Sequence, residues 1–494
     1  MSAGAQTQGG GAARSRGGGE WLAPLLAAAA TVAVTWGLLE RPRQTAAALV
    51  LAAVVTALVV SRHTLPRVTV ESVLRLCLFL LPMAALLGAS AAVPGFGQLF
   101  AFRVLIVAAI VAGLVWALAS RRLVLDAPRA PVLLFVAWFA WLTVTLLWAP
   151  DKVEGLRYLG LILLEITLMI ATAAAGTSRR WLRGLMITLA IAYGLSLLVA
   201  AAEILVGWHL SSSVGSHGGK AHVATGFLYN PNDLATLIAI AWPFALLALL
   251  LAPRHGQRLL AAAALGLSLW VLLDSGSRAS LIAIGIATLA LPFLVVRRRW
   301  VRRRGLLVGA TVALLALFAF LAFNPTDVPV LRQFRLVNLT EQTDYGTGSG
   351  STRLALIRSG GEVGARYAFL GVGPGNAGLL VKQQPDAPED VSALHNWWWE
   401  IFVNGGLPAL VLYGMLYVAL VTIALRVSRF ARDPFLQRLA AAVFLAMLGY
   451  TIGCLGPSTV VTFAPMWILF GLALAVAIAA RREVRDGDRI GEAT

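Results

Sequence analysis

The chain is dominated by apolar runs of roughly 18 to 22 residues that alternate with short polar breaks. A helix of about 20 residues is needed to cross the roughly 30 Å of hydrocarbon in a bilayer. Lipid offers no hydrogen-bond partner to backbone N–H and C=O groups, so a run that crosses it must be helical. The sequence therefore predicts an all-α fold, that of a polytopic integral membrane protein.

Composition supports this prediction. Hydrophobic residues make up 59% of the 494 residues, and charged residues make up only 13%. Soluble domains contain roughly 45–50% apolar and about 25% charged residues. A soluble multidomain protein is therefore excluded.

The apolar runs predict about fourteen membrane spans, with twelve as the lower limit. They lie near residues 21–39, 45–61, 70–91, 100–119, 130–149, 156–176, 183–206, 233–252, 258–273, 279–296, 305–323, 405–425, 438–455 and 461–480. The predicted domain order is a flexible Gly-rich cytoplasmic tail (1–20), a helix bundle (21–323), a large segment outside the membrane (324–404), C-terminal spans (405–480) and a cytoplasmic tail (481–494).

Lys and Arg are concentrated in alternate loops, and this bias predicts the orientation. The loops assigned to the cytoplasm, together with both termini, hold 26 of the 40 basic residues. Short cytoplasmic loops carry an excess of Lys and Arg, so both termini are predicted to be cytoplasmic. Segments 207–232, 274–278 and 324–404 then lie on the periplasmic or exterior face of the cytoplasmic (inner) membrane. The net charge of +17 has the same explanation, and nucleic-acid binding is not predicted.

Several kinds of site are excluded by topology and spacing. No nucleotide is available outside the cytoplasm, so "GVGPGNAG" (371–378) is not interpreted as a dinucleotide loop. Its glycines predict a tight turn whose backbone N–H groups could face an anion. No Cys, His and carboxylate cluster has zinc-ligand spacing, so no metal and no cofactor is predicted. Cys77 and Cys454 lie inside apolar runs, which favours free, buried thiols.

The stretch "LHNWWWEIFVNGGLPAL" (394–410) follows the predicted outer segment. His395, with an ordinary pKa of about 6.5, could accept a proton from a hydroxyl near pH 7. The structural alternative is an interfacial histidine that hydrogen-bonds a backbone carbonyl. Trp397, Trp398 and Trp399 fit either an aromatic belt at the membrane interface or a platform for sugar rings or a prenyl tail. Both interpretations stay open.

Arg278 begins an apolar run at the outer mouth of a helix, in "DSGSRASLI" (274–282), and Ser277 is suited to cap that helix. An arginine at this position costs several kcal/mol unless it is paired or hydrated. A guanidinium beside the positive end of a helix suits a phosphate group. The structural alternative is an ion pair with Asp274.

A second helix mouth is predicted at "TGFLYNPNDLA" (225–235), where Asn232 or Asp233 would cap the helix after Pro231. Other basic or titratable residues of the predicted outer segments are Lys220, His222, Arg353 and Arg358. Charged residues also occur within or near apolar runs, at Arg75, Glu165 and Glu203. Charge inside the membrane is by default a functional hypothesis, and here it would indicate a transporter.

Four elements, in this order, resemble the O-antigen ligase and polymerase superfamily: "TGFLYNPNDLA", "DSGSRASLI", "STRLALIRSG" with "FLGVGPGNAG", and "LHNWWWEIFVNGGLPAL". The resemblance spans about residues 220–415. It implies a glycosyltransferase that works outside the cytoplasmic membrane without a metal or a nucleotide sugar. Its donor would be a glycan on undecaprenyl pyrophosphate. The acceptor would be lipid A–core in a ligase and another lipid-linked repeat in a polymerase.

The resemblance assigns two residues directly. The family's histidine after the long loop matches His395, and the arginine of its "SRG"-like element matches Arg278. Many relatives carry a second arginine before the "NPN" element, but this chain reads "KAHVATG" there. Lys220, His222 or Arg353 could take that role. The remaining residues expected to bind substrate are Asn232, Trp397 and Trp398.

The expected reaction is direct displacement at the anomeric carbon, with inversion. His395 would orient or deprotonate the acceptor hydroxyl, and Arg278 would neutralise the leaving pyrophosphate. A ligase is favoured over a Wzy-type polymerase, and the acceptor is lipid A–core or another glycan. The alternative from another class is a lipid-linked glycan transporter or flippase, which would need a hydrated cationic cavity through the bilayer.

Overall fold

The computed structural model describes residues 70–88, 92–93, 96–120, 127–210, 212–214, 222–295, 349–384, 394–457, 459, 461 and 463–492. The predicted tail and spans at 1–20, 21–39, 45–61 and 305–323 lie outside the described residues. Lys220 and residues 324–348 of the predicted outer segment also lie outside them. Every other candidate site residue is described.

The chain divides into two compact units. The described residues of the first unit belong to the start of α3 (Val70–Leu87) and to α4 (Ala101–Ser120), from residue 103 onward. The second unit comprises residues 78–102 and 125–494. It includes a short antiparallel hairpin of β1 (Ala92–Val93) and β2 (Phe96–Phe100). Every described candidate site residue lies in the second unit.

The predicted all-α fold is confirmed. Among the described residues, eight helices are long and apolar enough to cross a membrane, and shorter apolar helices lie at 76–87, 101–112 and 278–294. Each predicted span that falls on described residues is a helix, whereas the total of twelve to fourteen stays a prediction. From residue 129 onward the described helices are α5 (Arg129–Thr145), η3 (Leu146–Trp148), α6 (Lys152–Ala174), η4 (Ala175–Thr177), α7 (Arg179–Val206), α8 (Pro231–Leu251), α9 (His255–Ser275), α10 (Arg278–Val295), α13 (Ser349–Arg366), α14 (Ala377–Lys382), α15 (Trp397–Phe430), α16 (Pro434–Gly453) and α17 (Ala464–Glu492).

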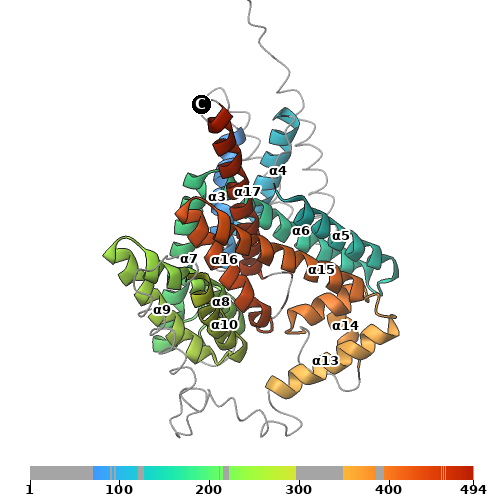
Figure 1. Ribbon diagram of the computed structural model, residues 1–494. Helices are drawn as coiled ribbons and strands as arrows, with labels where there is room; N and C mark the ends of the chain where they lie inside the picture. Colours follow the sequence, from blue (N-terminus) through green and yellow to red (C-terminus); the bar gives the residue numbers. More distant parts are fainter. Residues whose placement is uncertain are drawn as a thin grey trace, which may run out of the picture. The chain divides into compact units, whose positions relative to one another are not determined.

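Helices α16 and α17 lie at the centre of the second unit, between α8, α9 and α10 on one side and α5, α6 and α15 on the other (Figure 1). In the most apolar stretch of α17, 83% of the residues are buried, against 22% in α5 and α9. Small residues allow close approach, since a side chain on Gly471 would clash with Thr172 of α6. Cys77 and Cys454 are buried and free, as predicted.

The start of α8 corrects one prediction. Asn230, and neither Asn232 nor Asp233, caps this helix. Its side-chain oxygen accepts hydrogen bonds from the backbone N–H groups of Asn232 (2.7 Å) and Asp233 (3.1 Å). Pro231 fits the first helical position and keeps the residue before it extended, which places the Asn230 side chain over the free N–H groups.

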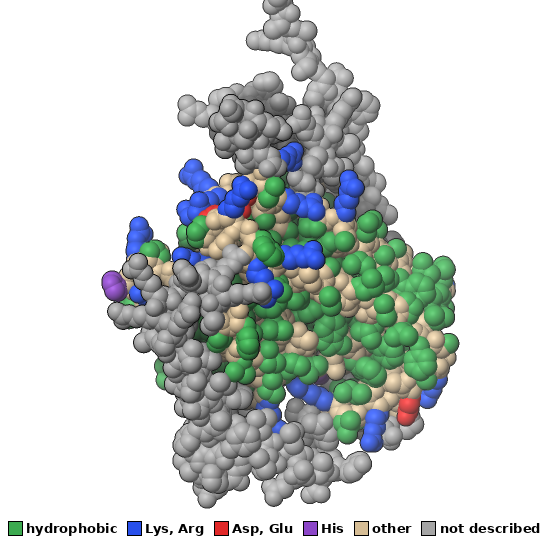
Figure 2. All heavy atoms as spheres, viewed as in Figure 1, with side chains coloured by type: hydrophobic (Ala, Val, Ile, Leu, Met, Phe, Trp, Pro, Cys, Tyr) green, Lys and Arg blue, Asp and Glu red, His purple; other side chains and the backbone are tan. Residues whose placement is uncertain are grey.

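One end of the second unit is rich in arginine, and we call it the basic end. Contacts join its helix ends: Arg179 of α7 pairs with Asp433 before α16 (2.8 Å), and Arg481 of α17 donates to the carbonyl of Ala127 before α5 (3.2 Å). Figure 2 shows Lys and Arg side chains gathered above a broad hydrophobic surface. The basic residues of this end are Arg129, Arg179, Arg180, Arg183, Arg254, Arg258, Arg426, Arg429, Arg432, Arg438, Arg481, Arg482 and Arg485. The opposite helix ends, where α6, α8, α10 and α15 begin, form what we call the site end.

Helix α15 is broken near its start. Gly406 has a left-handed φ of 73° and is followed two residues later by Pro408, so the helix divides into a short first half (397–405) and a long second half. The predicted span near 405–425 begins at this break. The first half of α15 therefore belongs to the segment that was predicted to lie outside the membrane.

The turn "FLGVGPGN" (369–376) fills the break. Leu407 donates its N–H to the Phe369 carbonyl (2.8 Å), and the N–H groups of Val372 and Gly373 donate to the carbonyls of Val403 and Asn404 (both 3.0 Å). These two N–H groups are therefore occupied, and they do not form the anion-binding turn that the glycines predicted. The glycines serve close packing instead, because a side chain at position 371 would clash with the α15 backbone.

Candidate active site

Three helices begin next to the C-terminal end of α16. At the start of α15, Trp397 donates its N–H to the Cys454 carbonyl (3.2 Å). In the second turn of α8, the Thr236 hydroxyl approaches the Gly453 carbonyl (3.4 Å). In α10, the Cβ of Ala283 lies 3.4 Å from the place of a Cβ on Gly453. The N-termini of α8, α10 and α15 therefore converge at the site end.

This convergence favours an anion. The first N–H groups of a helix lack intrahelical partners, and the helix dipole places roughly half a positive charge there. In α8 and α15 the first N–H groups are occupied by Asn230, by Asn396 and by the Cys454 carbonyl, so the attraction for a phosphate group comes from the positive dipole ends. Three neighbouring helix starts therefore form a suitable setting for a phosphate or pyrophosphate.

His395 lies immediately before the cap of α15, in a backbone conformation that non-glycine residues rarely adopt (φ 48°). The side chain of Asn396 caps the helix by accepting the N–H of Trp399 (3.2 Å). The imidazole is half-buried, and its Nδ1 atom is buried with no hydrogen-bond partner among the described residues. The Nδ1 atom of His395 therefore does not hydrogen-bond a backbone carbonyl of the described residues, which was the alternative role for this histidine.

Charges link His395 to two arginines that are distant in sequence. Burial and the nearby Arg353 both lower the pKa of His395 below its ordinary value. Burial and the nearby Arg278 in turn lower the pKa of Arg353. Arg353, on α13, therefore lies close enough to each of the other two residues to interact with it electrostatically. At pH 7 the imidazole is held neutral, which is the form that accepts a proton.

Arg278 is half-buried in the first turn of α10. As predicted, Ser277 precedes the helix, and its carbonyl accepts the N–H of Leu281 (3.1 Å). The Ser277 hydroxyl donates to the Ser280 hydroxyl (3.1 Å). Asp274, at the end of α9, interacts with the backbone N–H of Ala224.

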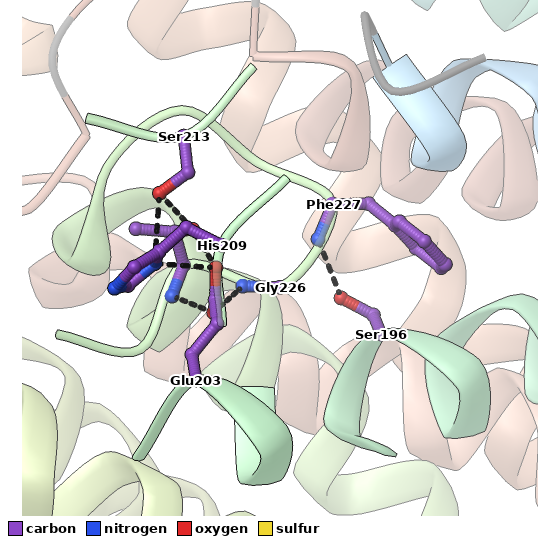
Figure 3. Close-up of polar contacts among 7 residues, drawn as sticks. Ser196, Glu203, His209, Ser213, Gly226 and Phe227 are labelled. Carbon is purple, nitrogen blue, oxygen red and sulfur yellow. Dashed lines mark hydrogen bonds and ion pairs between the residues drawn. The ribbon is translucent and has the colours of Figure 1, made fainter. Parts of the chain in front are cut away.

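Glu203 organises the loop before α8 (Figure 3). Its side chain is fully buried (0% exposed) near the end of α7. One carboxylate oxygen accepts the N–H groups of Thr225 (2.6 Å) and Gly226 (2.7 Å). The other accepts the Thr225 hydroxyl (2.7 Å) and is hydrogen-bonded to His209 Nδ1 (3.2 Å). These contacts give the buried carboxylate a structural role, which removes one reason for reading the chain as a transporter.

The loop that Glu203 holds also contacts α7 directly. Gly226 has a left-handed φ of 58°, and a Cβ there would lie 2.5 Å from the Ser196 hydroxyl oxygen. The same hydroxyl accepts the N–H of Phe227 (3.3 Å). The start of "TGFLYNPN" is therefore fixed on α7. In the sequence, the signs of this contact are the Thr225-Gly226 pair and an acidic residue, Glu203, near the end of an apolar run.

The other predicted binding residues occupy different positions. His222 is exposed, and its Nδ1 atom is hydrogen-bonded to the Ile204 carbonyl (2.9 Å) while its ring lies near Asp274. Asn232 is half-buried in the first turn of α8, where its carbonyl accepts the Thr236 hydroxyl (2.8 Å). Their roles in binding, like that of Lys220, stay predictions.

The three tryptophans of α15 differ in environment. Trp397 is 2% exposed and packs against Tyr413 and Tyr450, with ring centroids 6.0 and 5.8 Å away. It contributes to the core and presents no exposed ring face to a sugar. Trp398 is half-buried and donates its indole N–H to the Thr451 carbonyl (3.3 Å). Trp399 packs against Phe402 (4.8 Å). A binding role for Trp398 stays a prediction.

Two further observations concern charge and metals. In the described part of the chain, no group of three or more His, Cys, Asp or Glu side chains could hold a metal ion. Glu165 is buried in α6, and one of its carboxylate oxygens has no hydrogen-bond partner among the described residues. The side chain of Arg75 is not described.

Comparison with known proteins identifies the class. Residues 263–414, from α9 to the break region of α15, match the family described as O-Antigen ligase. The chain is also 25% identical over 366 residues to "Teichuronic acid biosynthesis protein TuaE" from Bacillus subtilis (strain 168), which covers 71% of this chain and 72% of the relative. The resemblance seen in the motifs is thereby confirmed.

The fold and these matches define a multi-pass membrane protein that processes glycans. Residues 263–414 are similar to the O-antigen ligase family, and 71% of the chain is similar to a protein of teichuronic acid biosynthesis. The family match contains Arg278, Arg353 and His395, whereas the "NPN" element lies before it. The histidine and the two arginines that interact electrostatically therefore all lie inside the matched region.

Proposed function

We propose that the protein transfers a glycan from undecaprenyl pyrophosphate to an acceptor hydroxyl at the outer face of the cytoplasmic membrane. The single observation that carries this proposal is the electrostatic neighbourhood of His395, Arg353 and Arg278 beside the helix starts. It combines a neutral base with two cations at one place. That combination suits attack on a sugar whose leaving group is a pyrophosphate.

His395 acts as the general base. The acceptor oxygen forms a bond to the anomeric carbon as the bond from that carbon to the pyrophosphate oxygen breaks. The hydroxyl proton passes to the imidazole, and the electron pair leaves with the lipid pyrophosphate. A single displacement of this kind inverts the anomeric centre. General-base assistance contributes typically about 10²–10⁴-fold to the rate.

Arg353 and Arg278 stabilise the leaving group. Two guanidinium groups held close together repel each other, and after burial the nearby Arg278 is the second cause of the lowered pKa of Arg353. A pyrophosphate between them would relieve this repulsion and accept charge-assisted hydrogen bonds from both. Arg353 then supplies the second cation that relatives carry before the "NPN" element. Lys220, His222 and Asn232 would lie on the donor's path to this site.

The orientation follows from the arginine distribution. The basic end would face the cytoplasm, with both termini, and the site end would face the periplasm or exterior. The lipid-linked donor then reaches the site laterally from the outer leaflet, and membrane lipids surround the spans. A transporter is less well supported, because the cations that converge lie at one end of the described helices.

The identity of the acceptor distinguishes a ligase-type from a polymerase-type reaction. A ligase-type reaction would use lipid A–core or another finished glycan. The relative's printed name, which refers to teichuronic acid biosynthesis, favours as a second candidate a polymerase-type reaction whose acceptor is another lipid-linked repeat. The two reactions share the donor chemistry and differ only in the hydroxyl that is presented to His395.

A reconstituted assay tests the proposal. Protein in lipid nanodiscs is given a labelled glycan on undecaprenyl pyrophosphate with either lipid A–core or unlabelled lipid-linked repeats. We expect a covalent product with one acceptor, and at least a 10²-fold loss of rate in His395→Ala. The matched control is His255→Ala, an exposed histidine at the basic end. Full activity of His395→Ala, or movement of lipid-linked glycan with no covalent product, would refute the proposal.

A further inference from the structure

An apolar turn connects α13 to the "GVGPGN" sequence. Ala368 and Phe369 both have left-handed backbones, with φ of 49° and 58°. Consecutive non-glycine residues in this region are strained, and such strain persists where the surrounding structure and function require it. The turn is held by hydrogen bonds, including Phe369 N–H to the Gly364 carbonyl (2.9 Å). We call residues 368–370 the apolar turn.

The strained backbone directs large apolar side chains outward. Phe369 is 48% exposed and Leu370 is 45% exposed. Part of the Phe369 ring packs on Phe402, with centroids 6.1 Å apart. A turn exposed to water would usually carry Gly, Asn or Asp at left-handed positions. Here the sequence places apolar residues at a conformation that disfavours them, so the side chains themselves must serve a purpose.

Two membrane-spanning helices flank the apolar turn. On the α15 side, Leu407 donates its N–H to the Phe369 carbonyl (2.8 Å). On the α5 side, the Trp148 indole N–H donates to the carbonyl of Gly371, the next residue (2.7 Å). The turn therefore lies at the site end of α5 and of the long half of α15.

Both flanking helices carry exposed apolar side chains. Exposed apolar residues form a stripe along each helix, at Leu133, Val136 and Val144 of α5 with Leu147 of η3, and at Leu407, Val411, Met415 and Val418 of α15. Apolar side chains that point outward from a spanning helix face lipid. Phe369 and Leu370 are exposed apolar residues beside the site end of these two helices.

The depth of the α15 break agrees with contact with lipid. The Trp141 indole N–H donates to the Gly405 carbonyl (2.6 Å), directly before the break. Trp141 lies seven residues before Trp148, which is about 10 Å along α5. The break therefore packs against the outer part of a spanning helix, and the turn that fills the break lies near the same level.

We propose that the apolar turn inserts Phe369 and Leu370 into the outer leaflet of the bilayer. The occupant of this surface is lipid, namely the acyl-chain region directly below the headgroups. Insertion would fix α13, which is no spanning helix, against the membrane surface. Since Arg353 lies on α13, the turn would also hold this guanidinium at the level of a lipid-borne phosphate; this last step rests on the proposed function.

The depth of residue 370 provides a direct test that needs no activity. Leu370→Cys is labelled with a nitrobenzoxadiazole probe in full-length protein and placed in nanodiscs that contain phosphatidylcholine with a nitroxide on carbon 5 of the acyl chain. The two native thiols are buried, and unmodified protein measures their background. Val411→Cys on the lipid-facing stripe and Glu362→Cys on the exposed side of α13 are the references for lipid and water.

We expect the probe at residue 370 to be quenched by the lipid nitroxide within about twofold of the probe at 411, and to be shielded from aqueous iodide. The probe at 362 should show the reverse. Equal iodide quenching at 370 and 362 would overturn the proposal by placing residue 370 in water. A probe at 370 that neither iodide nor the lipid nitroxide quenches would also overturn it, by placing that residue beneath protein.

A second measurement tests the functional step. The double variant Phe369→Ser with Leu370→Ser should raise the KM for the lipid-linked donor several-fold and leave kcat and the KM for the acceptor unchanged. If residue 370 lies in lipid but this variant has normal donor kinetics, insertion stands and its link to donor binding fails. If no glycosyl transfer is found at all, the depth result is unaffected.

Discussion

Removing the Glu203 carboxylate should release the loop that leads to α8. In Glu203→Ala the backbone N–H groups of Thr225 and Gly226 lose their acceptor inside a buried site. An unsatisfied buried donor costs about 1–3 kcal/mol, so two such donors cost about 4 kcal/mol in total. Since about 1.4 kcal/mol corresponds to a factor of ten, the local opening of this loop should become roughly 10³-fold more populated.

Glu203→Gln separates the loss of charge from the loss of the acceptor. Its amide oxygen can still accept both N–H groups, while its NH₂ group faces the Thr225 hydroxyl and His209, which can each accept a hydrogen bond. The remaining cost is that of replacing charge-assisted bonds by neutral ones, about 1 kcal/mol, or roughly fivefold in opening.

Hydrogen exchange of peptides that cover residues 222–230 measures this opening, with the protein in nanodiscs. We expect the order Ala, then Gln, then unmodified protein, with exchange in α16 unchanged. Glu154→Ala provides a matched control, because that carboxylate is partly exposed and pairs only with the exposed Arg157 (3.4 Å) among its described partners. Exchange in Glu203→Ala within threefold of the unmodified protein would refute the assigned role of the carboxylate.

Three more results are expected. Because the pKa of His395 is lowered, activity should fall only as the pH drops below about 6.5. Arg353→Gln removes a cation that lowers this pKa, so the fall in activity should move to higher pH. A pH profile that does not move would contradict the interaction between these two side chains. Gly371→Ala should lower thermal stability by several degrees, since its methyl group would meet the α15 backbone at Gly405, and an unchanged melting temperature would contradict that close contact. Asn230→Ala should cost about 1 kcal/mol through the lost cap of α8, while Asn232→Ala, measured by the same thermal unfolding, should cost less.

Residues that act through neighbours in sequence were predicted well. Long apolar runs have few alternatives to spanning helices, so each predicted span among the described residues is a helix. The beginning of a span near residue 405 coincides with the break at Gly406, because glycine and proline mark such points locally. Ser277, which directly precedes α10, was also predicted from its local sequence, because serine is a common residue at the start of a helix.

Contacts between distant segments could not be predicted in this way. Arg353 and Arg278 are separated by 75 positions, and only the structure, in which α13 packs against α15, reveals that the two guanidinium groups interact. The "GVGPGN" glycines carried a turn signal, but that signal does not distinguish N–H groups that bind an anion from N–H groups that bind a broken helix. The capping residue of α8 was missed by two or three positions, because the effect of Pro231 on the residue before it was not considered.

The broken helix has a mechanical consequence. His395 lies directly before its first half, and carbonyls at the break accept hydrogen bonds from the turn that follows α13, the helix of Arg353. We therefore expect α13 and the segment that begins α15 to move together in any rearrangement of the site, because these hydrogen bonds join them.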